Sequence, residues 1–181
     1  MSRLAPPAYE AMTDAQKEVH DAIVSGPRGT MRGPFLAWIT NPGMAMPAQK
    51  LGEYFRFNTA LSRDLAEIAI LVTGAHYEAE FEWWAHSRMA HEAGVSEEIT
   101  EAIRLGREPV FEDVKSKTVY ETARALNYDR RLSDDAFALA RQVLGEEGLM
   151  DVVGLCGYYA LVSLTLNVFE VETPDGSKAF S

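Results

Sequence analysis

The sequence predicts an all-α protein of about eight or nine helices. Apolar residues recur at helical spacing in most segments between turn signals, and no stretch alternates apolar and polar residues as a half-buried strand would. Ser, Thr, Gly and Pro punctuate these segments where helices begin and end. We expect one domain over 1–181, with an N-terminal arm and glycine-rich loop over 1–45 and a helical core over 46–170.

The first third of the chain is expected to hold three helices around a glycine-rich loop. Thr13 is a suitable N-cap, because its hydroxyl can accept a hydrogen bond from a first-turn amide. The segment 25–34, with three glycines and two prolines, must be a loop. Asn41-Pro42 stops the second helix, and Pro47 can begin the third. The expected helices are 13–24, 35–39 and 47–59.

Six further helices are expected in the rest of the chain. Ser62, Ser96 and Ser133 are suitable N-caps, and Gly94 and Gly145 suit the left-handed position at a helix end. A break near 77–79 separates the first two of these helices. The expected helices are 62–76, 80–93, 96–106, 114–126, 134–144 and 147–169.

Composition excludes several classes of function. The formal net charge is −10 and no Lys/Arg cluster stands out, so we expect no nucleic-acid partner. A single cysteine, Cys156, excludes an intramolecular disulfide and a Cys-x-x-Cys redox pair. The first residues contain no apolar signal-peptide region, so we expect a cytoplasmic protein.

The segment Val152–Phe169 raises the question of a membrane span, because its 18 residues carry no charge. Two glycines and three polar residues interrupt it, and no basic residues flank it. We therefore expect no membrane partner, and a helix buried inside the domain or at a subunit interface.

The stretch 65–94 organises the candidate chemistry, since it holds three of the four histidines. Glu82 and His86 are four residues apart and share one helix face. Glu67 precedes His86 by 19 residues, on the neighbouring antiparallel helix. We expect the three side chains to meet in a pocket between the helices. A carboxylate beside an imidazole raises its pKa and fixes its tautomer, which suits proton transfer.

Other interpretations of these residues stay open at this stage. Glu82 and His86 suit an ordinary exposed ion pair, and Glu67 suits a capping or salt-bridge role. Oxygen and nitrogen ligands also suit a metal. However, no third ligand stands at a familiar spacing, and His86 and His91 point away from each other on a helix, so we expect no metal site.

These residues resemble the carboxymuconolactone decarboxylase family, which includes the AhpD-like alkylhydroperoxidases. The resemblance covers nearly the whole chain. It implies an AhpD-like helical fold and a homo-oligomer, often a trimer or hexamer. It is carried by Glu67, the segment EWWAH that begins at Glu82, the following HEAGVSEEI, and the outlying patterns RGxxxGPF, LGEYxRF and GYYALV.

The resemblance to the peroxidase branch is incomplete. That branch carries Glu-x11-Cys-x2-Cys-x3-His; the glutamate and histidine fall on Glu67 and His86, but the cysteines fall on Ala79 and Glu82. A thiolate is the nucleophile of that chemistry, so its loss removes the known route of peroxide reduction. Cys156 lies far away in an apolar helix, where we expect a buried packing role.

The decarboxylase branch also lacks these cysteines. Resemblance to it implies a cofactor-free acid–base enzyme acting on a small carboxylated lactone or related enolisable organic acid. His86 would donate or shuttle the proton, Glu82 would orient it, and Glu67 would act as base or relay. The alternatives are an AhpD-like peroxidase with a degenerate cysteine site, and a non-catalytic helical oligomer that binds a hydrophobic ligand.

Such an enzyme needs cations to hold the substrate carboxylate and the enolate charge. Arg28 and Arg32 on the glycine-rich loop, and Arg56 on the following helix, are the candidates, and the loop suits a lid. Trp83 and Tyr158 are expected to line the pocket with other aromatic side chains. A solvated turn for the arginines and core packing for the aromatic residues remain the alternatives.

Overall fold

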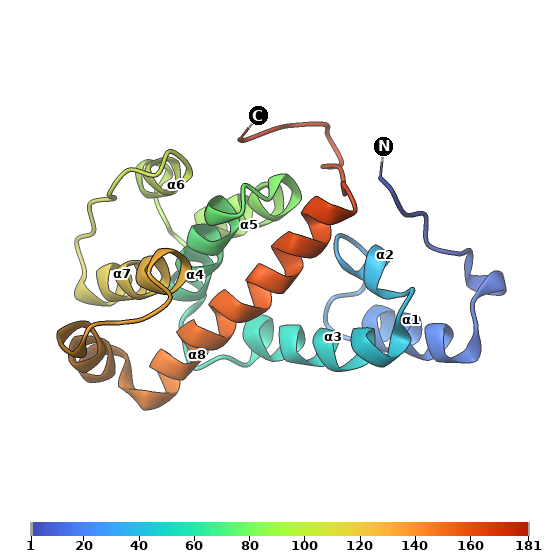
Figure 1. Cartoon of the computed structure of the whole chain (residues 1–181), viewed down its shortest axis with the longest axis horizontal. Helices are drawn as coiled ribbons and strands as arrows, with labels where there is room; N and C mark the ends of the chain where they lie inside the picture. The colour runs from blue at the N-terminus through green and yellow to red at the C-terminus, as the bar shows by residue number, and fades with distance from the viewer. Residues whose placement is uncertain (1, 181) are drawn as a thin grey trace.

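The structure, a computed structural model, describes residues 2–180, and within them every regular element is helical (Figure 1). This confirms the all-α prediction. One short 3-10 helix, η1 (Tyr9–Ala11), precedes eight α-helices. These are α1 (Asp14–Ser25), α2 (Phe35–Trp38), α3 (Pro42–Phe57), α4 (Arg63–His76), α5 (Glu80–Glu92), α6 (Glu97–Arg104), α7 (Val114–Tyr128) and α8 (Asp134–Val168).

Most helix ends follow the expected signals. Thr13 forms a capping box with Gln16, and Ser96 and Ser133 each accept a hydrogen bond from a first-turn amide. Gly145 has a φ of 75° inside α8, so the chain turns there as expected between two helical segments. A residue with a side chain would be strained in this left-handed conformation.

The expected start of α3 at Pro47 is wrong. The helix begins at Pro42, where Asn41 caps it by accepting a hydrogen bond from the amide of Met44. Proline is well suited to the first helical position, because its missing N–H has no partner there in any case. Pro47 lies inside the helix at an exposed position, where it costs one backbone hydrogen bond but does not end the helix.

Helix α4 is the centre of the core. All ten residues from 65 to 74 are buried, and α4 packs against α5, α7 and α8. A helix that is apolar all round is buried on every side, and Glu67 sits within this run. The second part of α8 crosses α4 and then passes above α3 (Figure 1).

Helix α8 is long and apolar enough to cross a membrane by length and composition. However, 61% of its most apolar window is buried inside the protein. This burial favours a core helix.

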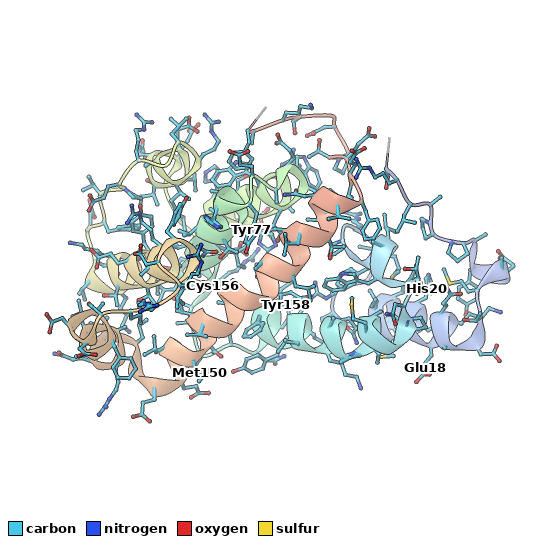
Figure 2. The ribbon with its side chains drawn as sticks, in the orientation of Figure 1. Glu18, His20, Tyr77, Met150, Cys156 and Tyr158 are labelled. Carbon is cyan, nitrogen blue, oxygen red and sulfur yellow. The ribbon has the colours of Figure 1, made fainter. Side chains whose placement is uncertain are left out.

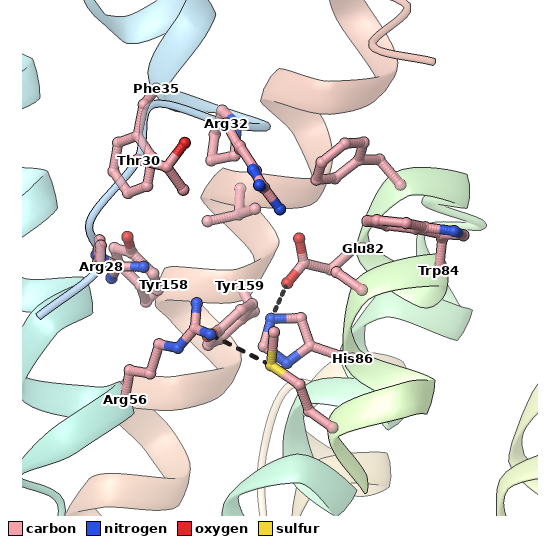
Figure 3. A pocket seen from close by; sticks show the side chains of 15 residues that line it. Arg28, Thr30, Arg32, Phe35, Arg56, Glu82, Trp84, His86, Tyr158 and Tyr159 are labelled. Carbon is pink, nitrogen blue, oxygen red and sulfur yellow. Dashed lines mark hydrogen bonds and ion pairs between the residues drawn. The ribbon is translucent and has the colours of Figure 1, made fainter. Parts of the chain in front are cut away.

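The two ends of the chain pack against the helical body. In the N-terminal arm, α1 packs on α3, and the loop that leaves α1 runs toward α5 and α8 (Figures 1 and 3). The C-terminal tail returns to α5, where the carboxylate of Glu80 accepts hydrogen bonds from the amides of Ala179 (2.5 Å) and Phe180 (3.2 Å).

Candidate active site

A tight turn between α4 and α5 brings the three predicted catalytic residues together. Glu78 adopts a φ of 48°, and the amide of Ala79 donates to the carbonyl of Gly74 at 3.0 Å, which reverses the chain. Glu67 in α4 then faces Glu82 and His86 in the first turns of α5. The break expected at 77–79 is confirmed.

His86 lies between the two carboxylates. Its Nδ1 is 2.6 Å from Glu67 Oε2, and its Nε2 is 2.9 Å from Glu82 Oε1 (the second contact is drawn in Figure 3). Exposed fractions are 5% for Glu67, 4% for Glu82 and 6% for His86, so the alternative of an exposed helical ion pair is wrong. The contact to Glu82 is close but poorly aligned, because Oε1 has no well-directed hydrogen bond.

The two carboxylates hold His86 as a cation. Burial alone would lower the pKa of His86, but the charges of Glu67 and Glu82 and the hydrogen bond with Glu67 raise it to about 10. An imidazolium at neutral pH can donate a proton but cannot accept one. The geometry therefore favours His86 as an acid over His86 as a base.

A cavity of about 220 Å³ opens above His86 and Glu82, and we call it the arginine cavity. Its walls come from five parts of the chain: the loop after α1, α2, α3, α5 and α8 (Figure 3). All three predicted arginines line it. Arg28 and Arg32 come from the loop, and Arg56 comes from α3.

Arg28 carries an unsatisfied charge. Its Nε and Nη2 are buried and have no hydrogen-bond partner in residues 2–180, while its guanidinium lies 4.9 Å from the centre of the Phe35 ring. An unpaired buried guanidinium is costly, and its planar fork matches a carboxylate. Arg28 is thus a cation in the cavity wall with unmet hydrogen-bonding capacity.

The prediction for the aromatic residues is half right. Tyr158 lines the arginine cavity, but Trp83 does not; its ring packs 5.4 Å from Phe180 in the tail. Trp84 and Phe81 line the cavity instead. Adjacent positions on a helix point about 100° apart, and the side chain of Trp83 falls on the side that the tail covers.

Tyr159 is a site residue that residue-level reasoning missed. Its ring stands edge-on to His86 with centroids 5.0 Å apart, and it lines the arginine cavity. Burial raises the pKa of Tyr159 well above its usual value, so the phenol stays neutral. The only sequence signal was the GYYALV pattern, which contains Tyr159.

Cys156 is outside the arginine cavity. It lies on the opposite side of α8 from Tyr158 (Figure 2), near Thr73 and Asn127. Burial raises the pKa of its thiol to about 11, despite hydrogen bonds with these two side chains. Such a thiol is a poor nucleophile at neutral pH. Across residues 2–180, no three His, Cys, Asp or Glu side chains are grouped to hold a metal ion.

Comparison with known proteins identifies the fold. No family model and no curated protein sequence matches the chain. An AhpD-core structure, an uncharacterized peroxidase-related protein from Ralstonia eutropha, superposes with a TM-score of 0.79 at 12% identity, covering 99% of this chain and 97% of that one. The chain has the AhpD-core fold.

Two further structures agree with this assignment. An uncharacterized peroxidase-related protein from Silicibacter has a TM-score of 0.76 at 10% identity, with coverage of 98% of this chain and 95% of that one. A protein of unknown function from Agrobacterium tumefaciens, described as a candidate antioxidant defence protein AhpD, has a TM-score of 0.67 at 15% identity and covers 79% and 99%. These likenesses establish the AhpD-like fold and do not single out the decarboxylase branch.

Proposed function

We propose that this protein is a cofactor-free acid–base enzyme that decarboxylates a small carboxylated lactone or related enolisable organic acid. The observation that carries the proposal is buried His86, held between two carboxylates at 2.6 and 2.9 Å at the floor of a cavity with three arginines. A protonated acid beside an anion-binding surface is the arrangement that such a reaction needs.

The reaction follows from this arrangement. The substrate carboxylate would pair with the guanidinium of Arg28, which lines the cavity. As the carbon–carboxylate bond breaks, CO2 leaves and the electron pair remains on the substrate as an enolate. Arg32 and Arg56 would stabilise that charge. His86 then gives its Nε2 proton to carbon, a step worth about 10²–10⁴-fold in rate.

A thiol peroxidase is the second candidate, and the printed names of the similar structures favour it. The site argues against it, because Ala79 and Glu82 stand where the peroxidase pattern has cysteines. The remaining thiol, Cys156, is buried outside the cavity. If the protein were a non-catalytic ligand-binding oligomer, the positive charge on His86 would have no function.

The proposal is tested by offering a panel of small carboxylated lactones in D2O. We expect CO2 release and one deuterium at the carbon that lost it. Arg28→Lys keeps the charge but loses the planar fork, so it should raise KM more than it lowers kcat. Arg107→Lys, far from the cavity in sequence and exposed, is the matched control. If no panel member loses CO2, the decarboxylase assignment fails.

A further inference from the structure

A second cavity of about 380 Å³ lies behind the catalytic residues, and we call it the rear cavity. It is bounded by the end of α3, the loop to α4, α4 itself and Tyr159 of α8. Glu67 lines the rear cavity, whereas Glu82 and His86 line the arginine cavity. The 2.6 Å contact between His86 Nδ1 and Glu67 Oε2 therefore connects the two.

The wall between the cavities is thin. Arg56 and Tyr159 each line both cavities. Tyr159 packs edge-on against the His86 ring and holds it in place. A proton can therefore reach the pair from the rear without passing through the arginine cavity.

Charge balance at the buried site indicates a function for the rear cavity. With His86 protonated, as its raised pKa favours, a single positive charge lies between two carboxyl groups in a buried site. When His86 gives its Nε2 proton to a substrate, the group is left with two buried carboxylates and a neutral ring. Unpaired buried charge is costly, so uptake of one proton restores the balance. During this step a substrate fills the arginine cavity and keeps water from reaching the three side chains through it.

We propose that the rear cavity is the proton port of the site, through which Glu67 takes up a proton from water as His86 releases one to the substrate. One proton enters at Glu67 and one leaves at Nε2, so the buried charge is unchanged. When the product leaves, water in the arginine cavity returns a proton to Nε2 and Glu67 releases its own. The direction of transfer rests on the proposed function; the solvent access of the pair does not.

The test needs no substrate. In protein labelled with 15N-histidine, NMR measures how fast the Nδ1 and Nε2 protons of His86 exchange with water. Ala66→Leu narrows the rear cavity beside Glu67, and Ala85→Leu is the matched substitution beside His86 in the arginine cavity. We expect Ala66→Leu to slow exchange of the Nδ1 proton at least tenfold, and Ala85→Leu to leave it within about twofold.

The opposite pattern would overturn the port. If Ala85→Leu slows the Nδ1 proton, or Ala66→Leu does not, water reaches the pair through the arginine cavity. Ile70→Phe, also in the rear cavity, replaces Ala66→Leu if that variant does not fold. If Ala66→Leu does not slow exchange but CO2 release requires His86, only the proton-port proposal fails. If Ala66→Leu slows exchange but no CO2 is released, only the decarboxylase proposal fails.

Discussion

His86 is an unusual histidine because both ring nitrogens face buried carboxylates. Its pKa is raised from an ordinary 6.5 to about 10. A raised pKa in the folded protein contributes stability that is fully present below pH 6.5 and is lost as the pH rises toward 10. The charge on this ring therefore supports both the fold and the proposed chemistry.

The first prediction concerns this charge. We expect the ring carbon-bound protons of His86 to show no titration in NMR spectra between about pH 5 and 8.5. The free energy of unfolding should fall as the pH rises from about 7 to 10. A titration midpoint for His86 near pH 6.5 would contradict the effect of the two carboxylates on its pKa.

A second prediction concerns Gly52, which lets Tyr158 and Arg28 approach α3. A Cβ at this position would lie 2.0 Å from Tyr158 Oη and 2.7 Å from Arg28 Nη2. Gly52→Ala should therefore displace both side chains and destabilise the protein by about 1–3 kcal/mol in denaturant unfolding. Gly43→Ala, in the first turn of the same helix, meets only ordinary contacts and should be neutral or stabilising by up to about 1 kcal/mol. Equal changes in stability for Gly52→Ala and Gly43→Ala would refute the close approach of Tyr158 and Arg28 to α3.

At the scale of elements, the α4–α5 hairpin and the tail together shape the site. The hairpin sets the positions of the candidate catalytic residues, and the tail supports the far side of α5. Trp84 Nε1 donates to Asp175 at 2.8 Å, and the Arg88 guanidinium lies 4.7 Å from the Trp84 ring. Hydrogen bonds from Ser177 and then Trp84 lower the pKa of Asp175 to about 2, so these contacts persist across the physiological range.

The third prediction follows from this support. Asp175→Ala should free the Trp84 ring, shift tryptophan emission to longer wavelength and make the tail more sensitive to protease. Trp38 is buried away from the tail, so the shift reports on Trp84 and on Trp83, whose ring packs against Phe180 of the tail. Asp175→Asn keeps an acceptor for the indole and should retain most of the wild-type spectrum. Identical spectra for Asp175→Ala and wild type would mean that the tail does not hold this ring.

Helical spacing and cap residues predicted the elements well, because helix ends depend on local chemistry. The fault at Pro47 arose because Asn41-Pro42 both ends one helix and starts the next, and a start signal is hard to recognise beside a stop. The placement of Trp83 in the cavity failed for a different reason. Sequence does not give the rotation of α5 or the return of the tail across one of its faces.

At the scale of the whole molecule, distant segments converge on the candidate site. Spacing indicated the pairing of Glu82 with His86 and placed Glu67 on the neighbouring helix, and the family resemblance pointed to the same three residues. The loop arginines reach the cavity because α1 packs on α3, a long-range contact that periodicity cannot predict. The molecule carries a net charge of −10, yet three arginines make this one cavity locally positive.

A fourth prediction concerns assembly, which stays a proposal. Large apolar side chains remain exposed along one face of the second part of α8, on a helix whose other side is core. A homo-oligomer, trimer or hexamer, would cover them. Light scattering should give a mass that is a multiple of 20.1 kDa. The double variant Leu161→Glu, Leu164→Glu should have the mass of a single chain. A wild-type mass of one chain would contradict this. The exposed side chains are Met150, Val153, Leu161, Leu164 and Val168.

The central claim is that this AhpD-like fold carries out proton transfer and not thiol redox chemistry. Its most direct test is a paired assay in which wild type, His86→Gln and Cys156→Ser are each measured for CO2 release from carboxylated lactones and for hydroperoxide reduction. We predict CO2 release that falls about 10²–10⁴-fold in His86→Gln and is unchanged in Cys156→Ser. Hydroperoxide reduction that is lost in Cys156→Ser and kept in His86→Gln would contradict the account.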